Sequence, residues 1–319
     1  MLQLHSIRSY HIGGERRALQ GRPVEQRVLA QGSAPRPIDM NGDHMVGQMY
    51  VQHYRQVAPV RPWPVVLWHG GGMTGANWET TPDGRDGWLQ QWLAAGFDVI
   101  VTDAMERGRS SWAPWPELYT TAPISRSLQE GWEMFRIGPA AGYASAPQAR
   151  RAHPGQQFPV DAFDQFACQW VPRWTGHDEP IMAAYGQLLD QVGPCLLVGH
   201  SQGGGFALRA AAQWPDRVKA VVALEPSGAP ALQGASAGLR QVPHLVVWGD
   251  FFDQHPQWQR YRATVDAYTQ GLQAQGVPVT PLVLAEHGLP GHSHFPMLDR
   301  QSDAVGRLVA HWLLDSASR

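Results

Sequence analysis

The sequence predicts an α/β fold: a mostly parallel, twisted sheet flanked by helices, with an inserted cap region. Two observations lead to this prediction. Short apolar runs, typical of strands buried on both faces, alternate with longer amphipathic segments. One such run ends in the segment 199–203, Gly-His-Ser-Gln-Gly, directly before an Ala-rich stretch. Glycines two positions either side of a serine allow a strand and a helix to pack around a sharp turn that exposes the hydroxyl.

The first third of the chain supplies one half of this sheet. Residues 24–31 and 43–55 alternate between apolar and polar side chains and predict an antiparallel pair of strands at the sheet edge. The apolar runs 64–68 and 98–103 predict buried strands, and residues 88–95 between them predict a helix. A helix between two such strands implies a right-handed crossover and parallel pairing.

The same alternation of strands and helices resumes after residue 178. The predicted elements are a helix at 180–191, a strand at 195–200, a helix at 204–213, strands at 218–224 and 244–248, a helix at 258–274, a strand at 279–284 and a helix at 301–314.

Residues 111–178 interrupt this pattern and are rich in Trp, Pro, Ala and Gly. Structureless loops of that length are rare inside compact domains, so we predict an inserted cap with helices near 125–136 and 161–170. Residues 1–110 and 179–319 then form the core. We hypothesise that tryptophan side chains from the insert line an apolar pocket for the substrate. These residues are Trp112, Trp115, Trp132, Trp170 and Trp174.

Composition excludes several classes of function. The formal net charge of −2 gives no reason to expect nucleic acid or a membrane surface as partner. The sequence contains no run of 18 apolar residues, so no membrane span is predicted. Residues 1–20 lack the apolar centre of a signal peptide, so the expected location is the cytoplasm, or secreted or periplasmic if the chain is a trimmed mature form. Cys168 and Cys195 lie far apart and form no redox or metal motif.

A serine hydroxyl becomes a good nucleophile only when an oriented base removes its proton. In this architecture the order along the chain is serine, acid, histidine, so the base for Ser201 should lie between the last strand and the last helix. His294 is the first choice there because it lies nearest the final helix, His292 is the second and His287 the third. An His-x-His pair can bind metal, but no acidic or cysteine partner lies at ligand spacing, so no metal site is predicted.

The acid that orients the histidine has more than one candidate. Many hydrolases of this type carry it three residues after a glycine, and Phe252 occupies that position here. Asp250 and Asp253 lie on either side of it. Glu225 directly follows the predicted strand 218–224 and is favoured, because a carboxylate one strand over from the serine can still reach the histidine.

The negative oxygen of a tetrahedral intermediate needs two N–H donors. The N–H of Gln202 is one candidate, since it follows the serine at a helix N-terminus. The other should come from the loop after strand 64–68, where the segment 69–72 reads His-Gly-Gly-Gly. Gly71 is the favoured donor because its backbone can approach the substrate closely.

The segment GHSQGG, the His-Gly-Gly loop and DAMERGRSS (103–111) resemble the α/β-hydrolase superfamily over nearly the whole chain. More narrowly, WETTPDGRDGW (78–88), ALEPSG (223–228) and GHSHFPMLDR (291–300) are similar to the bacterial esterase 713-like branch. That resemblance implies a triad of Ser201, Glu225 and His294, a carboxylic-ester hydrolase without cofactors, and a homodimer. This chain departs from that branch at one place. The prototype of the branch has paired cysteines in the oxyanion loop, whereas this chain has Gly71 and Gly72, so no disulfide is expected there.

The sequence therefore predicts a serine hydrolase that cleaves a small carboxylic ester through an acyl-enzyme. The same machinery would also suit a thioesterase, lactonase, amidase or carbon–carbon bond hydrolase. A ligand-binding member of the fold without catalysis is disfavoured, because the chain offers a complete serine, acid and histidine set.

Overall fold

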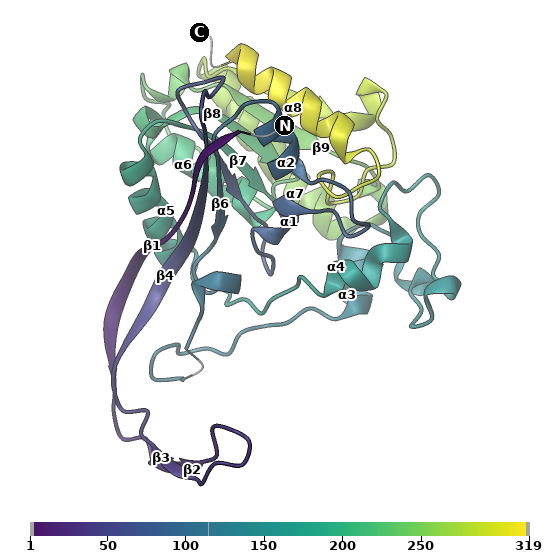
Figure 1. Cartoon of the computed structure of the whole chain (residues 1–319). Helices are drawn as coiled ribbons and strands as arrows, with labels where there is room; N and C mark the ends of the chain where they lie inside the picture. The colour runs from purple at the N-terminus through teal and green to yellow at the C-terminus, as the bar shows by residue number, and fades with distance from the viewer. Residues whose placement is uncertain (1–2, 114, 317–319) are drawn as a thin grey trace.

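The computed structural model describes residues 3–113 and 115–316. It contains a sheet of eight strands in the order β1-β4-β6-β5-β7-β8-β9-β10 (Figure 1). Strands β5 to β10 are parallel, whereas β4 runs antiparallel to β6 and β1 antiparallel to β4. The predicted mostly parallel sheet is confirmed. The strands are β1 Leu4–Leu19, β4 Gly42–Gln56, β5 Val65–Trp68, β6 Val99–Asp103, β7 Cys195–His200, β8 Val218–Leu224, β9 His244–Trp248 and β10 Val279–Val283.

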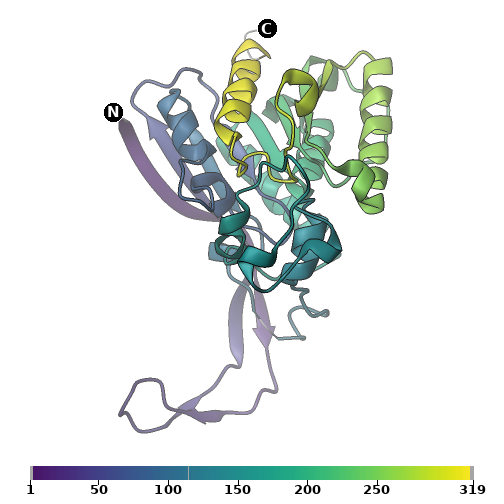
Figure 2. The same cartoon turned by 90° about the vertical axis from the view of Figure 1, so that its right-hand side faces the viewer.

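Helices cover both faces of the sheet, and alternate strand residues supply the two cores. Leu197 of β7 faces the core under α5, α6 and α7, and its neighbour Leu196 faces the core under α2 and α8. Figure 2 views the molecule from the side that carries α8. The helices are α1 Ala76–Glu79, α2 Trp88–Ala94, α5 Asp178–Val192, α6 Gln202–Gln213, α7 Pro256–Ala274 and α8 Ser302–Ser316.

The predicted pairing at the sheet edge is half wrong. Strand β4 covers the expected range 43–55, but its antiparallel partner is β1, not residues 24–31. Strand β1 lies at the edge of the sheet and most of its side chains face solvent, so its apolar alternation is too weak to be seen in the sequence. Within 24–31, the apolar side chains of Val24, Val28 and Leu29 are 54%, 57% and 57% exposed.

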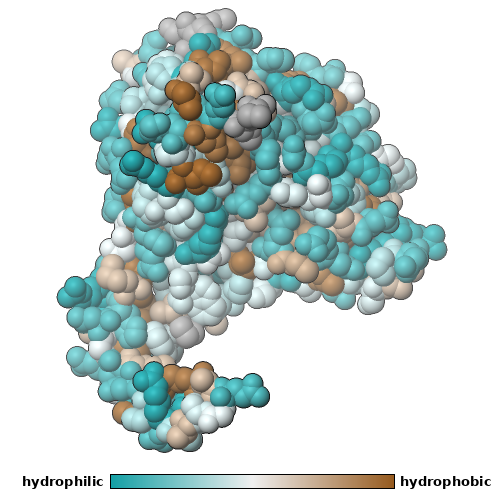
Figure 3. Space-filling model, viewed as in Figure 1, coloured by the Kyte–Doolittle hydropathy of each residue, from teal (hydrophilic) through white to brown (hydrophobic). Residues whose placement is uncertain are grey.

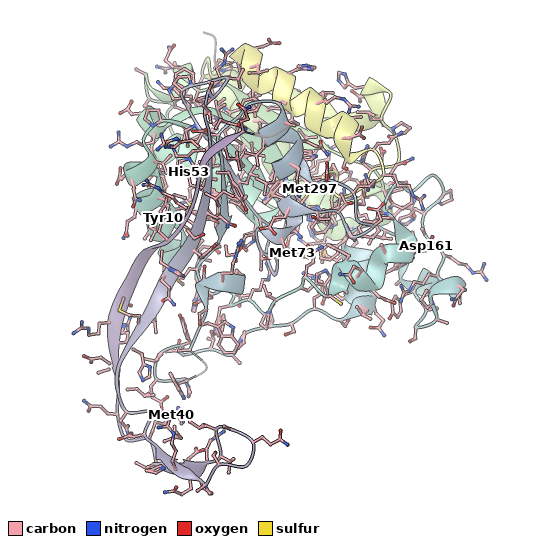
Figure 4. The ribbon with its side chains drawn as sticks, viewed as in Figure 1. Tyr10, Met40, His53, Met73, Asp161 and Met297 are labelled. Carbon is pink, nitrogen blue, oxygen red and sulfur yellow. The ribbon has the colours of Figure 1, made fainter. Side chains whose placement is uncertain are left out.

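The outer halves of β1 and β4 extend beyond the body of the protein as a hairpin arm (Figure 1). Strand β4 pairs with β6 only over residues 50–54, so the preceding part of β4 is held by β1 alone within the sheet. Strands β2 Glu25–Arg27 and β3 Arg36–Ile38 pair with each other at the tip, where Figure 4 labels Met40. Figure 3 shows apolar atoms among polar ones on this tip.

Residues 111–113 and 115–178, which follow β6 and which we call the insert, contain helices α3 Leu128–Met134 and α4 Phe163–Ala167 and several 3₁₀ turns. Both lie inside the predicted helical ranges and are shorter. Helix α3 begins at a cap, where the Ser127 hydroxyl accepts a hydrogen bond from the N–H of Glu130 at 3.2 Å. Aromatic side chains of the insert, among them Trp132, Phe158 and Phe163, are buried in the same core as α2 and α8. The division into a core and a separate cap stays a prediction.

In the described ranges, we find no helix with the length and apolar character that a membrane crossing requires.

Candidate active site

Ser201 lies at the turn between β7 and α6 and is partly exposed. Its backbone is left-handed, with φ 54° and ψ −117°, a conformation that L-residues rarely adopt. A Cβ at Gly199 would lie 2.1 Å from the carbonyl oxygen of Gly203, and one at Gly203 would lie 2.5 Å from that of His69. Glycine is therefore required on both sides of the serine, as the sequence predicted for a sharp turn.

The favoured acid and the favoured histidine lie together. Glu225 follows β8 in a left-handed conformation (φ 49°), and its carboxylate is buried. Nδ1 of His294 donates a hydrogen bond to Oε2 of Glu225 at 3.3 Å. Because Nδ1 holds the proton, Nε2 is the ring nitrogen that is able to accept one. The N–H of His294 donates to the carbonyl of Phe135 at 3.0 Å, which fixes the ring from the insert.

The alternative histidines are engaged elsewhere or exposed. Nδ1 of His292 bonds to Oδ2 of Asp299 at 3.0 Å, and both the N–H and the hydroxyl of Ser293 donate to the same carboxylate. This buried cluster shapes the histidine loop. His287 is exposed at the end of a 3₁₀ turn. It lies at the start of the histidine loop, and the final helix follows the other end of that loop.

The alternative acids bond to other groups. Oδ2 of Asp250 accepts a hydrogen bond from the N–H of Gly291 at 2.5 Å, so this carboxylate fastens the start of the histidine loop. Asp253 is exposed and accepts from the side chain of Gln254 at 2.9 Å. Neither aspartate contacts His294 through a hydrogen bond of the described structure.

A buried arginine completes the acid side of the site, and no pattern in the sequence indicates it. Nη2 of Arg136, from the insert, donates to Oε2 of Glu225 at 2.7 Å, and both side chains are fully buried. The guanidinium lies 4.0 Å from the ring centroid of Phe252, and its Nε donates to the carbonyl of Asp250 at 2.7 Å. An isolated carboxylate would be costly at this depth, and the ion pair with Arg136 offsets that cost.

The imidazole of His294 is held neutral. Burial, followed by the positive charge of Arg136, keeps the pKa of His294 well below its usual range. Arg136 also offsets the attraction that the Glu225 carboxylate alone would exert on a protonated ring. A neutral histidine at neutral pH is the form that accepts a proton.

The glycine loop after β5 packs directly against the serine. A Cβ at Gly70 would lie 3.0 Å from the Cβ of Ser201, and one at Gly71 would lie 2.9 Å from Oε1 of Gln202. His69 holds this loop in place, because its Nε2 accepts the N–H of Ala104 at 2.9 Å. Burial lowers the pKa of His69 to about 4, so this ring is neutral as well. The structure thus places Gly71 next to the side chain of Gln202, and the role of their N–H groups as oxyanion donors stays a prediction.

The five tryptophans of the insert do not form one wall. Trp170 lines a cavity together with Gly71 and Gly72. Trp132 fills the core, and Trp112 packs on Trp174 with ring centroids 5.0 Å apart. Their spacing along the chain cannot distinguish a pocket wall from core packing, because the insert shares the core of the main sheet. Trp115 packs beside the ring of His44 in the arm.

The described residues contain no group of three or more His, Cys, Asp or Glu side chains placed to hold a metal ion. Cys168 and Cys195 are free thiols, the first exposed and the second buried.

Comparisons with known proteins agree with this architecture. A family model for the alpha/beta hydrolase fold matches residues 64–270. A solved structure described as a novel bacterial esterase at atomic resolution matches with a TM-score of 0.84 and 29% sequence identity, over 99% of this chain and 98% of that one. The probable secreted lipase phiG of a fungal species (strain ATCC 74256) is 34% identical over 193 residues, which are 57% of this chain. The match spans 50% of that lipase, about half its length. Because the family model covers more than half of the sequence, this chain belongs to the α/β-hydrolase family.

Proposed function

We propose that this protein is a serine hydrolase that cleaves carboxylic esters through an acyl-enzyme intermediate. Two observations carry the proposal: the hydrogen bond between His294 and Glu225, and a serine in a strained, partly exposed turn whose N–H donates to the carbonyl of Leu224, directly before Glu225. The esterase and lipase names of the two relatives support ester cleavage as the reaction.

In the proposed reaction, Nε2 of His294 takes the proton of the Ser201 hydroxyl while the Ser201 oxygen attacks the ester carbonyl. The N–H groups of Gly71 and Gln202 donate to the negative oxygen that forms. His294 then gives its proton to the departing alcohol. Water attacks the acyl-enzyme, with His294 again accepting a proton, and the acid product leaves.

Glu225 orients the imidazole and stabilises its positive charge during each proton transfer. Its own position is well defined, because Oε1 accepts the N–H of Gly249 at 2.5 Å while Oε2 faces both Arg136 and His294. A carboxylate held from both sides keeps the ring in the tautomer that the reaction needs.

The test combines covalent labelling with turnover. A fluorophosphonate probe should label the wild-type protein at Ser201 and leave Ser201→Ala unlabelled, with mass spectrometry of the peptide as readout. Hydrolysis of a panel of aryl and alkyl esters with graded acyl chains should depend on Ser201, and matched thioesters and amides should react more slowly. A wild-type protein that neither labels nor hydrolyses any ester would contradict the proposal and favour a ligand-binding role.

The predicted cytoplasmic location stays a prediction, and the name of the fungal relative describes a secreted protein.

A further inference from the structure

A small cavity lies between the oxyanion loop and the insert. It is lined on one side by residues 71–73 and on the other by residues of two insert segments, 124–130 and 170–173. These segments hold each other through paired backbone hydrogen bonds between Ile124 and Arg173, at 2.8 and 3.0 Å. The N–H of Val171 donates to the carbonyl of Gly72 at 2.9 Å, which fastens the insert to the loop.

The guanidinium of Arg173 lies directly on Gly71 in this cavity. A Cβ added to Gly71 would lie 2.2 Å from Nη1 and 3.2 Å from Cζ of Arg173. The guanidinium therefore occupies space that a side chain at residue 71 would take, and it would have to move if residue 71 were larger. The arginine consequently sits next to the N–H that we propose as an oxyanion donor.

The charge of Arg173 is not balanced locally. In the described parts of the chain, the guanidinium of Arg173 forms no ion pair with a carboxylate and no hydrogen bond to a protein oxygen. The second arginine of the cavity, Arg126, differs: its Nη1 donates to Oε1 of Glu130 at 2.6 Å, and its guanidinium lies 5.1 Å from the ring centroid of Phe135. With Arg126 and Glu130 offsetting each other, the cavity keeps one net positive charge, and that charge is on Arg173.

We propose that Arg173 binds a carboxylate carried by the substrate, so that the preferred esters are half-esters of dicarboxylic acids or esters of similar shape that carry a carboxylate near the scissile bond. This proposal rests on the proposed ester hydrolysis and adds the class of substrate. A guanidinium presents parallel N–H donors that match a carboxylate in a bidentate pair. Because Arg173 contacts Gly71, the bound carboxylate would lie only a few bonds from a carbonyl held in the oxyanion loop.

The test compares pairs of esters in which one member carries a carboxylate and the other carries a neutral group in its place. Ethyl hydrogen succinate and ethyl butanoate place the carboxylate on the acyl side; 4-acetoxybenzoate and its methyl ester place it on the alcohol side. For wild type we expect a preference of about 10- to 100-fold in kcat/KM for the charged member of one pair. In Arg173→Gln this ratio should fall toward one, mainly through KM of the charged ester, and Arg173→Lys should keep part of it.

Arg151, an exposed arginine of the same insert, provides the matched control, and Arg151→Gln should leave the ratio as in wild type. The proposal would be overturned if wild type showed no preference in either pair, or if the preference survived in Arg173→Gln. An equal fall in kcat on charged and neutral esters would also overturn it, because Arg173 would then act on the oxyanion itself. Failure of the ester hydrolase proposal looks different: no neutral or charged ester would be hydrolysed in a Ser201-dependent way.

A binding measurement separates the carboxylate-binding proposal from the ester hydrolase proposal. Succinate should raise the melting temperature of the wild-type protein and of Ser201→Ala, but raise that of Arg173→Gln much less. This readout does not depend on turnover. Equal shifts in all three proteins would count against Arg173 as the carboxylate site.

Discussion

Arg136 and His294 contact the same carboxylate oxygen, Oε2 of Glu225, at 2.7 and 3.3 Å. One contact comes from the insert and the other from the loop before the last helix. The oxygen therefore joins a permanent cation to a ring whose charge changes during the proposed reaction. The pH dependence of the enzyme should reflect this arrangement.

We expect the acid limb of kcat/KM for wild type to lie below the ordinary histidine pKa of about 6.5, because burial and Arg136 lower the pKa of His294 and the neutral ring is the active form. Replacing the cation in Arg136→Met should raise the pKa of His294 and move the acid limb to higher pH. Initial rates on a neutral ester across pH measure this. An acid limb that stayed in place in Arg136→Met would contradict the role of Arg136.

Arg136→Met should also reduce the free energy of unfolding by about 3 to 5 kcal/mol, because it leaves a buried carboxylate unpaired. The double variant Arg136→Met/Glu225→Gln removes both charges and should recover part of that loss in urea unfolding experiments. If the double variant were no more stable than Arg136→Met, the ion pair would not be the source of the loss.

The choice of acid can be tested with two isosteric variants. Glu225→Gln should lower kcat by about 10²- to 10⁴-fold, because the amide no longer stabilises the charged ring. Asp250→Asn should have a much smaller effect, since Asp250 bonds to Gly291 of the histidine loop rather than to His294. Both are measured as kcat on one activated ester, with unfolding midpoints as the control for folding. The reverse order of effects would reassign the acid to Asp250.

The strained turn at Ser201 predicts an unusual order of stability. Ser201→Gly and Ser201→Ala should both be inactive, but the glycine variant should be more stable by about 1 kcal/mol, because glycine adopts the left-handed conformation without steric cost. At most positions the opposite holds, since glycine gives the unfolded chain more freedom. Urea unfolding of the two variants measures the difference. An alanine variant of equal or higher stability would show that the turn stores no strain.

Buried histidines should make the protein sensitive to acid. Burial lowers the pKa values of His69 and His244 to about 4, and it lowers that of His200 as well. Each ring takes up a proton near pH 6.5 when the chain unfolds but not while it is folded. The stability that these rings contribute is therefore complete above pH 6.5 and is lost as the pH falls from 6.5 toward about 4.

Urea midpoints measured between pH 7 and pH 5 test this, with the same m-value expected throughout. His244→Leu removes one of the protons taken up on unfolding and should make the pH dependence shallower. His311 is exposed on α8, so His311→Leu is the control and should leave the slope unchanged. A stability that did not vary over this range would be inconsistent with neutral buried rings.

The apolar strands and the helices after residue 178 could be predicted because burial on both sheet faces leaves a clear apolar pattern, and β8 and β9 have the predicted bounds. Strand β1 could not, because its pairing depends on backbone hydrogen bonds while its side chains face solvent. Arg136 and Arg173 could not either, since an arginine in an irregular segment carries no local sign of which carboxylate or loop it will meet. The homodimer implied by the resemblance stays a prediction that light scattering tests directly.

The contacts of Phe135 and Arg136 limit how this protein can be redesigned. The insert that borders the cavity beside Gly71 also holds the His294 backbone through Phe135 and pairs with Glu225 through Arg136. Grafting the insert of another hydrolase onto this scaffold would therefore exchange selectivity and proton relay together. A chimera that keeps a cation at position 136 should retain turnover, while one chosen for pocket shape alone should not.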